Sequence, residues 1–593
     1  MARHLVWSAL VLCSVLAVAC GPTTPAAPQA TAQAGAATSA AQPTSQAAAQ
    51  STSQAAQPSS QGTPQPTPQA TGPQVRITLN QEPDTLNPFY SGLRATFTVT
   101  QAIFNGLVVV NEQGDYEGDL ATEVPTVQNG GVSADGLTIT YKLRQGVKGA
   151  DGQPFTADDV KFTFDAIMNP ANTISGKSVY GKIDSLNVKD PYTVELKMKE
   201  PYAAYAEFFS YPIGILPGHA LGSLADLNKA DFNRKPFGTG PYRVTDWQAA
   251  NYIQLDANPN YYKGAPKIGR VIVRIVPDKN TQLAQVRANE TDVAVDLNED
   301  DAVQVDRIPG WKAFAIAGLT SDRLFLNLAE PGVADGSRPH PILGDKRVRQ
   351  ALEMGIDKQQ LVDKVLSGKT KVATSEYPVG WAAPNLEPSK YDVETARRLL
   401  DEAGWQVGAD GIREKDGRKL HLTISSTSGN TLRENVEQLI QAGWKAMGVD
   451  LEIKNATAAV LVGEWSENGL VQRGNFDIAY YGFTPGIDPS GTISPRFHSK
   501  QIPYEGNQGE GDNGMRYRDP QVDQWIDEAD RTLDQARRKE LYGEVMRKIA
   551  DDVPVMYLYN RANVEAVSQR VQGPHSHPFR WLTWNIHEWS LSQ

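Results

Sequence analysis

The chain is 593 residues long and carries 57 Lys or Arg and 68 Asp or Glu residues, so its formal net charge is −11. That length exceeds what one hydrophobic core usually organises, and we expect about two or three lobes. The acidic balance argues against nucleic acid as a partner. Because Cys13 and Cys20 are the only cysteines, the rest of the sequence can form neither a disulfide nor a thiolate metal site.

The amino terminus has the order of an export signal. Arg3 precedes an apolar run over residues 5–18, which is shorter and more weakly flanked than a typical membrane span. The run ends in LAVACG at residues 16–21, which resembles the lipobox of bacterial lipoproteins. We predict a lipoprotein signal peptide over residues 1–20, with Cys20 as the lipidated residue. The alternative is a plain signal peptide in which Cys20 has no role.

Residues 21–74 form a segment of almost nothing but Ala, Gln, Thr, Ser and Pro, without a charged residue. Such a composition cannot bury enough apolar surface to offset the entropy of ordering the chain. We therefore predict a disordered tether, which as a flexible coil would hold the body on the order of 40 Å from its anchor. A lipid anchor explains such a tether better than free secretion does.

The body opens with a short strand and a rigid loop. Residues 75–79 alternate as a strand, and the string EPDTLNP at residues 82–88 is held extended before each proline. Further on, residues 137–143 alternate as a half-buried strand, and Thr156 opens a helix. We interpret Asp158 and Asp159 as a helix cap and a solvated neighbour, not as a catalytic carboxylate pair.

A glycine- and proline-rich corner follows at residues 235–242, KPFGTGPY. A phosphate-binding loop would need a helix directly after it, but residues 242–246 continue as a strand. The pattern therefore indicates a corner where the chain re-enters a sheet.

Two strand–helix–strand units predict α/β lobes. They cover residues 270–276, 281–288 and 292–296 in the first unit, and residues 421–425, 431–447 and 449–453 in the second. Each predicts a parallel strand pair with a right-handed crossover. We expect the second helix to begin with a capping box from Thr431 to Glu434 and to bury Leu432, Val436, Leu439 and Ile440.

Helices are predicted between and after these units. Asp345 and Asp357 are expected to cap two consecutive short helices, with Gly368 in the left-handed conformation that ends the second. Residues 522–533 and 541–549 have the apolar period of two more helices, before a strand at residues 555–559.

A buried strand at residues 476–483 is followed by the loop TPGIDP. In open α/β sheets ligands collect at the carboxyl ends of strands. This places Phe483, Thr484 and Asp488 near any cleft. For Asp488, a carboxylate that caps its own loop is the alternative.

Several strings resemble the extracellular solute-binding proteins that serve dipeptide, oligopeptide and nickel ABC importers, known as family 5. They are EPDTLNP, the phrase SADGLTITYKLRQGVKGADGQPFTADDV at residues 133–160, KPFGTGPY, and GDKRVRQALEMGID at residues 344–357. With the closing helices, the resemblance extends from about residue 75 to residue 573.

The resemblance implies a periplasmic-binding-protein type II fold: two α/β lobes with a hinge plus an extra scaffold subdomain. The implied division is lobe I at 75–110, 237–335 and 560–593, the scaffold subdomain at 111–236, and lobe II at 336–559. It also implies an extracytoplasmic protein that captures a peptide or peptide-sized solute by lobe closure and delivers it to an ABC-type importer. We expect a monomer without cofactor or metal, attached to the membrane, in the periplasm or on the outer face, through its lipid alone.

In the family, the loop at residues 82–88 borders the ligand cavity, and a tryptophan stands where this chain has Phe483. Peptide-binding members also hold the ligand's α-amino group with an aspartate that has no counterpart before Asp488. We predict ligand contacts from Phe89, Tyr90, Ser91, Trp381, Phe483, Thr484 and Asp488.

Three alternatives stay open. An oligosaccharide would suit the aromatic side chains of the chain. Nickel would need ligands, but His575 and His577 lie in a proline-flanked segment without an adjacent acid, where we expect a surface turn. An exported hydrolase is disfavoured, because the sequence lacks G-x-S-x-G and residues 587–591 lack the second histidine of H-E-x-x-H; paired carboxylates of a glycosidase have no fixed sequence spacing.

Overall fold

The computed structural model describes residues 72–592, except 175–176, 211 and 223–225. The predicted signal peptide, Cys20 and nearly all of the tether lie outside the described residues. Gln74, the last residue of the predicted tether, begins strand β1 (Gln74–Leu79). In the described part of the chain, no helix is long and apolar enough to cross a membrane.

The largest sheet of the described structure has ten strands, in the order β16-β15-β17-β11-β18-β10-β1-β9-β8-β7. Besides β1, its strands are β7 (Tyr242–Gln248), β8 (Tyr252–Ala257), β9 (Arg270–Ile275), β10 (Val293–Leu297), β11 (Trp311–Leu326), β15 (His421–Ser426), β16 (Asp450–Ile453), β17 (Ile478–Phe483) and β18 (Val555–Ser568). Separate hydrophobic clusters pack along the two halves of this sheet.

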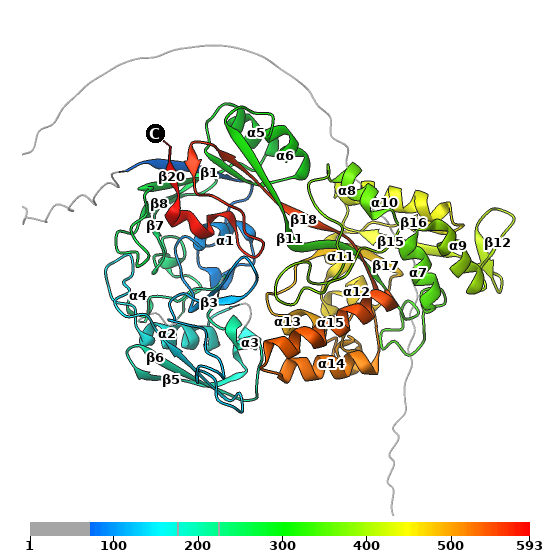
Figure 1. Cartoon of the computed structure of the whole chain (residues 1–593), viewed down its shortest axis with the longest axis horizontal. Helices are drawn as coiled ribbons and strands as arrows, with labels where there is room; N and C mark the ends of the chain where they lie inside the picture. Colours follow the sequence, from blue (N-terminus) through cyan, green and yellow to red (C-terminus); the bar gives the residue numbers. More distant parts are fainter. Residues whose placement is uncertain (1–71, 175–176, 211, 223–225, 593) are drawn as a thin grey trace, which may run out of the picture. The chain divides into compact units, whose positions relative to one another are not determined.

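Strands β11 and β18 are antiparallel partners that run through both halves of the sheet (Figure 1). At one end β11 pairs with β17, and at the other end β18 pairs with β10. The register between β11 and β18 shifts between Ala317 and Ser321. Such an irregularity bends a strand, so the two lobes share one sheet that bends where they meet.

In lobe I, β9 and β10 are parallel, as predicted, but they are not direct neighbours. Strand β1 lies between them and pairs in parallel with both. Between these two strands, the apolar residues Val75, Ile77 and Leu79 of β1 are buried, as parallel strands that are covered on both faces require. The helices of this lobe are α1 (Arg94–Thr100), α5 (Lys279–Arg287) and α6 (Glu299–Val305).

In lobe II, the caps Asp345 and Asp357 are confirmed, because their carboxylates accept hydrogen bonds from the amides of Arg347 and Gln360. Gly368 has φ of +65°, as expected. The main helices are α7 (Lys346–Met354), α8 (Lys358–Val365), α9 (Val393–Glu402), α10 (Thr431–Lys445), α13 (Ser490–Phe497), α14 (Pro520–Arg531) and α15 (Gln535–Asp552).

The unit β15-α10-β16 forms the predicted parallel pair. Two details were wrong. The N-cap of α10 is Asn430 rather than Thr431, because the Asn430 side chain accepts from the amide of Arg433. Leu439 is 37% exposed, whereas Trp444 at the end of the same helix is fully buried. The buried face is therefore rotated toward Trp444.

The scaffold subdomain packs a three-stranded sheet with a helix, namely β4 (Thr138–Lys142), β5 (Ile183–Asp190), β6 (Thr193–Met198) and α2 (Ala157–Met168). Thr156 and Asp159 form the capping box of α2, and Asp158 is exposed. This confirms that the two acids are a cap and a solvated neighbour.

The short elements near the lobe boundary are β2 (Val108–Val110), β3 (Tyr116–Gly118), η1 (Pro88–Tyr90), η2 (Tyr205–Glu207) and η7 (Leu582–Glu588). Elsewhere lie α3 (Lys177–Tyr180), α4 (Gly218–Leu221), α11 (Ala458–Val462), α12 (Leu470–Arg473), β12 (Gln406–Val407), β13 (Arg413–Lys415), β14 (Arg418–Lys419), β19 (Val571–Gln572) and β20 (Ser590–Leu591).

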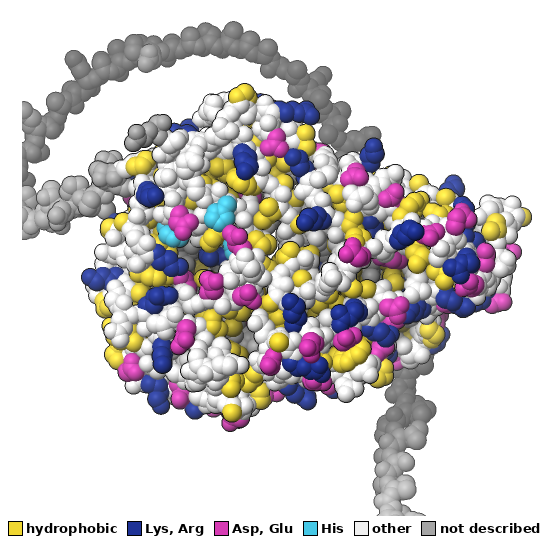
Figure 2. Space-filling view, in the orientation of Figure 1, with side chains coloured by type: hydrophobic (Ala, Val, Ile, Leu, Met, Phe, Trp, Pro, Cys, Tyr) yellow, Lys and Arg dark blue, Asp and Glu magenta, His cyan; other side chains and the backbone are white. Residues whose placement is uncertain are grey.

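On the face shown in Figure 2, basic and acidic side chains are interspersed rather than separated. The surface of α14 and α15 illustrates this, since Arg537 lies 2.8 Å from Glu528 and 3.1 Å from Glu540. The negative net charge is thus not gathered into one field on this face.

Candidate functional site

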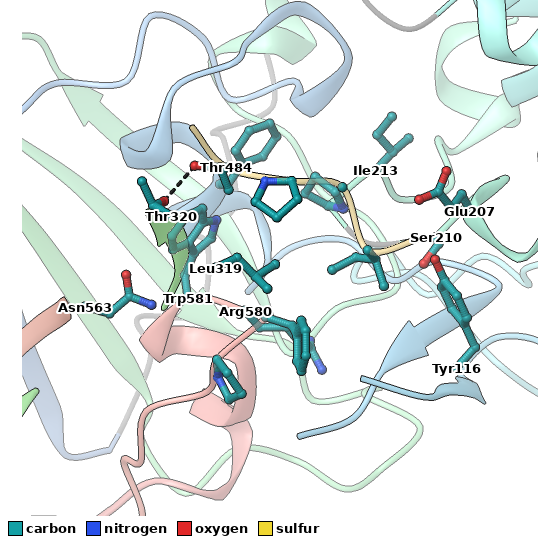
Figure 3. A pocket seen from close by; sticks show the side chains of 17 residues that line it. Tyr116, Glu207, Ser210, Ile213, Leu319, Thr320, Thr484, Asn563, Arg580 and Trp581 are labelled. Atoms are coloured by element: carbon teal, nitrogen blue, oxygen red, sulfur yellow. Dashed lines mark hydrogen bonds between the residues drawn. The ribbon is translucent and has the colours of Figure 1, made fainter. Parts of the chain in front are cut away.

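A cavity of about 370 Å³ lies where the lobes, the scaffold subdomain and the crossing strands meet (Figure 3). By the predicted division of the chain, Phe97 of α1 and the segment 578–581 belong to lobe I, and Tyr116 and the lining residues between 207 and 213 belong to the scaffold. The crossing strands contribute Leu319, Thr320 and Asn563, and lobe II contributes residues 484–487. A site built from all these parts is complete only when the lobes are together.

Most of the cavity wall is apolar. Its larger apolar side chains are Phe97, Ile213, Leu319, Ile487, Phe579 and Trp581. Mostly apolar walls with a few placed polar groups are typical of small-molecule sites, and the volume falls in their usual range of about 300–1,000 Å³.

The polar groups at one end of the cavity belong to the scaffold subdomain. In Figure 3, Glu207, Ser210 and Tyr116 lie at this end, whereas Thr320, Asn563 and Trp581 lie at the other. Glu207 ends the short helix η2, and its carboxylate accepts a hydrogen bond of 3.0 Å from the backbone amide of Asp488 in lobe II. This contact joins the scaffold to lobe II.

The environment of Glu207 disfavours a charged carboxylate. Burial, and secondarily the negative charge of Asp488, raise the pKa of Glu207 to about 8. Ser210 is only 3% exposed, and neither its hydroxyl nor that of Tyr116 has a hydrogen-bond partner among the described residues. This end of the cavity therefore holds polar groups that the described part of the protein leaves unsatisfied.

Thr484 lines the cavity from the loop after β17, as the strand-end argument predicted. Its hydroxyl lies 2.6 Å from the hydroxyl of Thr320 in β11. Phe483, one residue earlier, has two guanidinium groups near its ring, with Arg496 at 3.6 Å and Arg323 at 5.5 Å from the ring centre. For both residues, ligand contact stays a prediction.

Asp488 is 2% exposed, and its carboxylate is fully engaged. Its oxygens accept from Arg538 at 2.5 and 2.7 Å, and from the amide and hydroxyl of Ser490 at 3.0 and 2.6 Å. Both functions weighed for Asp488 remain compatible with its position, since it lines a second hollow of about 560 Å³.

That second hollow lies between the scaffold and lobe II, and Tyr116 lines it as well as the first cavity. Trp381 faces it, with its ring 6.4 Å from that of Tyr542 and 5.2 Å from the guanidinium of Arg538. The predicted role of Trp381 in ligand binding is therefore confined to this second hollow.

The three residues predicted after the first loop pack inside the molecule, although the Tyr90 hydroxyl has no hydrogen-bond partner among the described residues. Phe89 is 1% exposed in the core, and the Ser91 hydroxyl bonds to that of Thr96 at 3.1 Å. The Tyr90 hydroxyl is buried, and burial together with the charge of Asp226 raises its pKa to about 12. None of the three is among the described residues that line the first cavity. Their ligand contacts stay predictions.

The surface turn that we expected for the histidine segment is wrong for His577, whereas the side chain of His575 is 44% exposed and lies 3.0 Å from Glu112. His577 is 1% exposed, because its ring accepts from the amide of Phe579 and packs edge-on against Trp584. Burial, with the positive charges of Arg580 and His575, lowers the pKa of His577 to about 3. Among the residues that the structure describes, no group of three or more His, Cys, Asp or Glu side chains is arranged to hold a metal ion.

Sequence reasoning missed the scaffold side of the cavity. One signal was present: Glu207 is the only charged residue in the aromatic-rich run YAAYAEFFSYP at residues 202–212. A lone acid in such a run predicts a buried carboxylate, which needs a partner or a function.

Comparison with known proteins agrees with this architecture. The family model "Bacterial extracellular solute-binding proteins, family 5 Middle" matches residues 115–504. The chain is 29% identical over 526 residues to the oligopeptide-binding protein AppA of Bacillus subtilis, covering 86% of this chain and 90% of that protein. It is 26% identical over 493 residues to the glutathione-binding protein GsiB of Pectobacterium atrosepticum, covering 82% and 89%.

Two solved structures share the fold. One is Bacillus subtilis AppA in complex with a nonapeptide, with 27% identity, a TM-score of 0.66, and coverage of 88% of this chain and 99% of that chain. The other is NikZ from Campylobacter jejuni in complex with Ni(L-His), with 27% identity, a TM-score of 0.68, and coverage of 87% and 99%. The predicted type II fold is confirmed. Since the family model matches more than half of the 593 residues of this chain, the chain belongs to the bacterial extracellular solute-binding proteins of family 5.

Proposed function

We propose that this protein captures a peptide or peptide-sized solute in the 370 Å³ cavity by lobe closure and delivers it to an ABC-type importer, without chemistry of its own. The observation that carries the proposal is the composition of the cavity wall. Both lobes, the scaffold and both crossing strands line it, so only the closed form encloses a ligand. The bend between Ala317 and Ser321 supports a hinge in these strands.

Peptide as the ligand class is supported by the relatives named as oligopeptide-binding and glutathione-binding proteins. The importer as partner is what the family resemblance implies. The same proposal includes an extracytoplasmic monomer, lipidated at Cys20 and tethered to the membrane. Labelled palmitate should enter the wild-type protein but not Cys20→Ser.

Thermal unfolding of the purified protein tests the ligand class. The panel comprises di- to pentapeptides, cello- and manno-oligosaccharides and nickel salts. A ligand that binds only the folded state adds about 2.7 kcal/mol at 100 times its dissociation constant. A shift with peptides supports the proposal, whereas a shift confined to sugars would make the protein a saccharide binder. Turnover of a panel member without any shift would contradict the binding function.

A further inference from the structure

The scaffold end of the cavity has an unusual imbalance of polar groups. Glu207 offers a second carboxylate oxygen beyond the one bonded to the Asp488 amide, and within the described part of the chain no other hydrogen bond to this carboxylate exists. The hydroxyls of Ser210 and Tyr116 are buried without partners among the described residues. All three side chains line the same cavity (Figure 3).

The chemistry of these groups defines a complementary ligand group. A carboxylate only accepts hydrogen bonds, and each hydroxyl can accept one. A primary ammonium group carries three N–H donors, no acceptor and one positive charge. It would therefore satisfy all three protein groups together and neutralise the carboxylate.

A neutral ligand would fit less well. A sugar hydroxyl could donate to Glu207, but it would leave this partly buried carboxyl either protonated or with an uncompensated negative charge, and the charge is costly in an apolar cavity. Arg538, the arginine whose charge acts on Glu207, is already engaged by Asp488. Arg580 also lines the cavity, but its charge acts on His577. The positive charge that Glu207 lacks is thus best supplied by the ligand.

We propose that Glu207, Ser210 and Tyr116 form the binding site for a primary ammonium group of the ligand. This inference rests on the proposed function and specifies the chemistry of its substrate: a solute with a free amino group, held from the scaffold subdomain. The group is either the α-amino terminus of a peptide or a lysine side chain.

The site also couples recognition to closure. Lobe II reaches Glu207 through the amide of Asp488 and covers the carboxylate when the lobes are together. Without a cation, closure is opposed by the free-energy cost of removing the charged Glu207 carboxylate from water. An ammonium group beside the carboxylate compensates its charge and removes this cost. A ligand that binds the closed state better shifts the equilibrium toward closure, and the ammonium group provides that difference.

Retention of synthetic peptide pools by the immobilised full-length protein tests the proposal. Three pools of tri- to pentapeptides are compared: lysine-free with a free α-amino group, lysine-free and N-acetylated, and N-acetylated with lysine. We expect the wild type to prefer an amine-bearing pool over the lysine-free acetylated pool by about tenfold to a hundredfold, as for hydrogen bonds to charged groups. Preference for the first pool assigns the α-amino terminus, and preference for the third assigns a lysine side chain.

Glu207→Gln keeps the shape of the side chain and an acceptor for the Asp488 amide but removes the charge. It should reduce the preference by at least about tenfold. Ser210→Ala and Tyr116→Phe should each reduce it by about twofold to tenfold, which keeps the test valid if the first variant fails to fold. Glu123→Gln, an exposed acid of the same subdomain, is the matched control and should keep the full preference.

The outcomes separate the two proposals. Equal retention of the amine-bearing and the lysine-free acetylated pools, or an unchanged preference in Glu207→Gln, would overturn the ammonium site and leave peptide capture intact. If no pool is retained, the proposed function fails, and the ammonium site fails with it.

Discussion

The two walls of the cleft each present a carboxylate, but in opposite conditions. On the lobe II side, Asp488 has a bidentate arginine and two further donors from Ser490. On the scaffold side, Glu207 has one amide donor, and burial raises its pKa to about 8. The difference teaches that the fold itself supplies several donors to one acid near the cleft and leaves the other acid with a single donor.

This contrast divides the work between the walls. Asp488 ties its loop on the lobe II wall to α15 through Arg538. Glu207 keeps a free carboxylate oxygen, so the scaffold wall can recognise a cation. The variants below test whether the Asp488 carboxylate stabilises the fold and whether Glu207 has the uncompensated carboxylate that the proposed ammonium site requires.

The largest effect is expected on the lobe II side. Arg538→Met removes the partner of a buried carboxylate and should lower the free energy of unfolding by about 3–5 kcal/mol in urea denaturation, because Asp488 is left as an uncompensated buried charge. Arg537→Met, its exposed neighbour on α15, is the matched control and should change stability by less than about 1 kcal/mol. Equal losses from both variants would refute the assignment of Asp488 to the fold.

An intermediate effect of opposite sign is expected on the scaffold side. Because the pKa of Glu207 rises from 4.5 to about 8 on folding, its favourable contribution is complete below pH 4.5 and is lost as the pH rises through 8. The pKa difference corresponds to a contribution of at most about 5 kcal/mol to the free energy of unfolding. Because solvent screens the charge of a partly exposed group, we expect about 1–3 kcal/mol.

Glu207→Gln should therefore be more stable than the wild type at pH 8 and equally stable at pH 4. Thermal unfolding of both proteins across this range, without ligand, provides the comparison, with Glu123→Gln as the variant that should follow the wild-type curve. A wild type that gains stability relative to Glu207→Gln with rising pH would show that the carboxylate is compensated from within the protein.

The smallest effect concerns the place where lobe II meets the crossing strands. Thr484→Val removes the hydroxyl pair with Thr320 and should lower the free energy of unfolding by about 0.5–1.5 kcal/mol. Thr320→Val should have a similar effect, and the double variant should cost less than the sum, since both remove the same interaction. Full additivity in urea denaturation would show that the two hydroxyls act independently.

Local features of the fold were predictable from the sequence. The caps Asp345 and Asp357 and the capping box at Thr156 depend on residues within one turn, and the structure confirms them. The cap of α10 was misplaced because Asn430 and Thr431 are both good caps and only the backbone conformation chooses between them.

Features that depend on distant pairing were not predictable. Strand β11 was missed, and only the first residues of β18 were predicted, because both change burial pattern along their length as they pass from one lobe to the other. The position of β1 between β9 and β10 likewise depends on residues about 200 positions apart.

For the site, the strand-end rule led to Thr484, which lines the cavity. Glu207 and Ser210 were missed because the single-turn helix η2 and the segment after it have no periodic pattern, and only the tertiary fold brings them to Tyr116. The satisfied state of Asp488 was equally hidden, since Arg538 is 50 residues away in sequence.

A crystal structure of the protein with a peptide retained from the amine-bearing pool would test the central claim most directly. The account predicts a closed form in which the ligand's primary ammonium nitrogen lies about 2.7–2.9 Å from the free oxygen of Glu207. It also predicts that Asp488 keeps its bond to Arg538. A closed complex with the ammonium group on Asp488 and Arg538 displaced, or with the ligand outside the cavity, would contradict it.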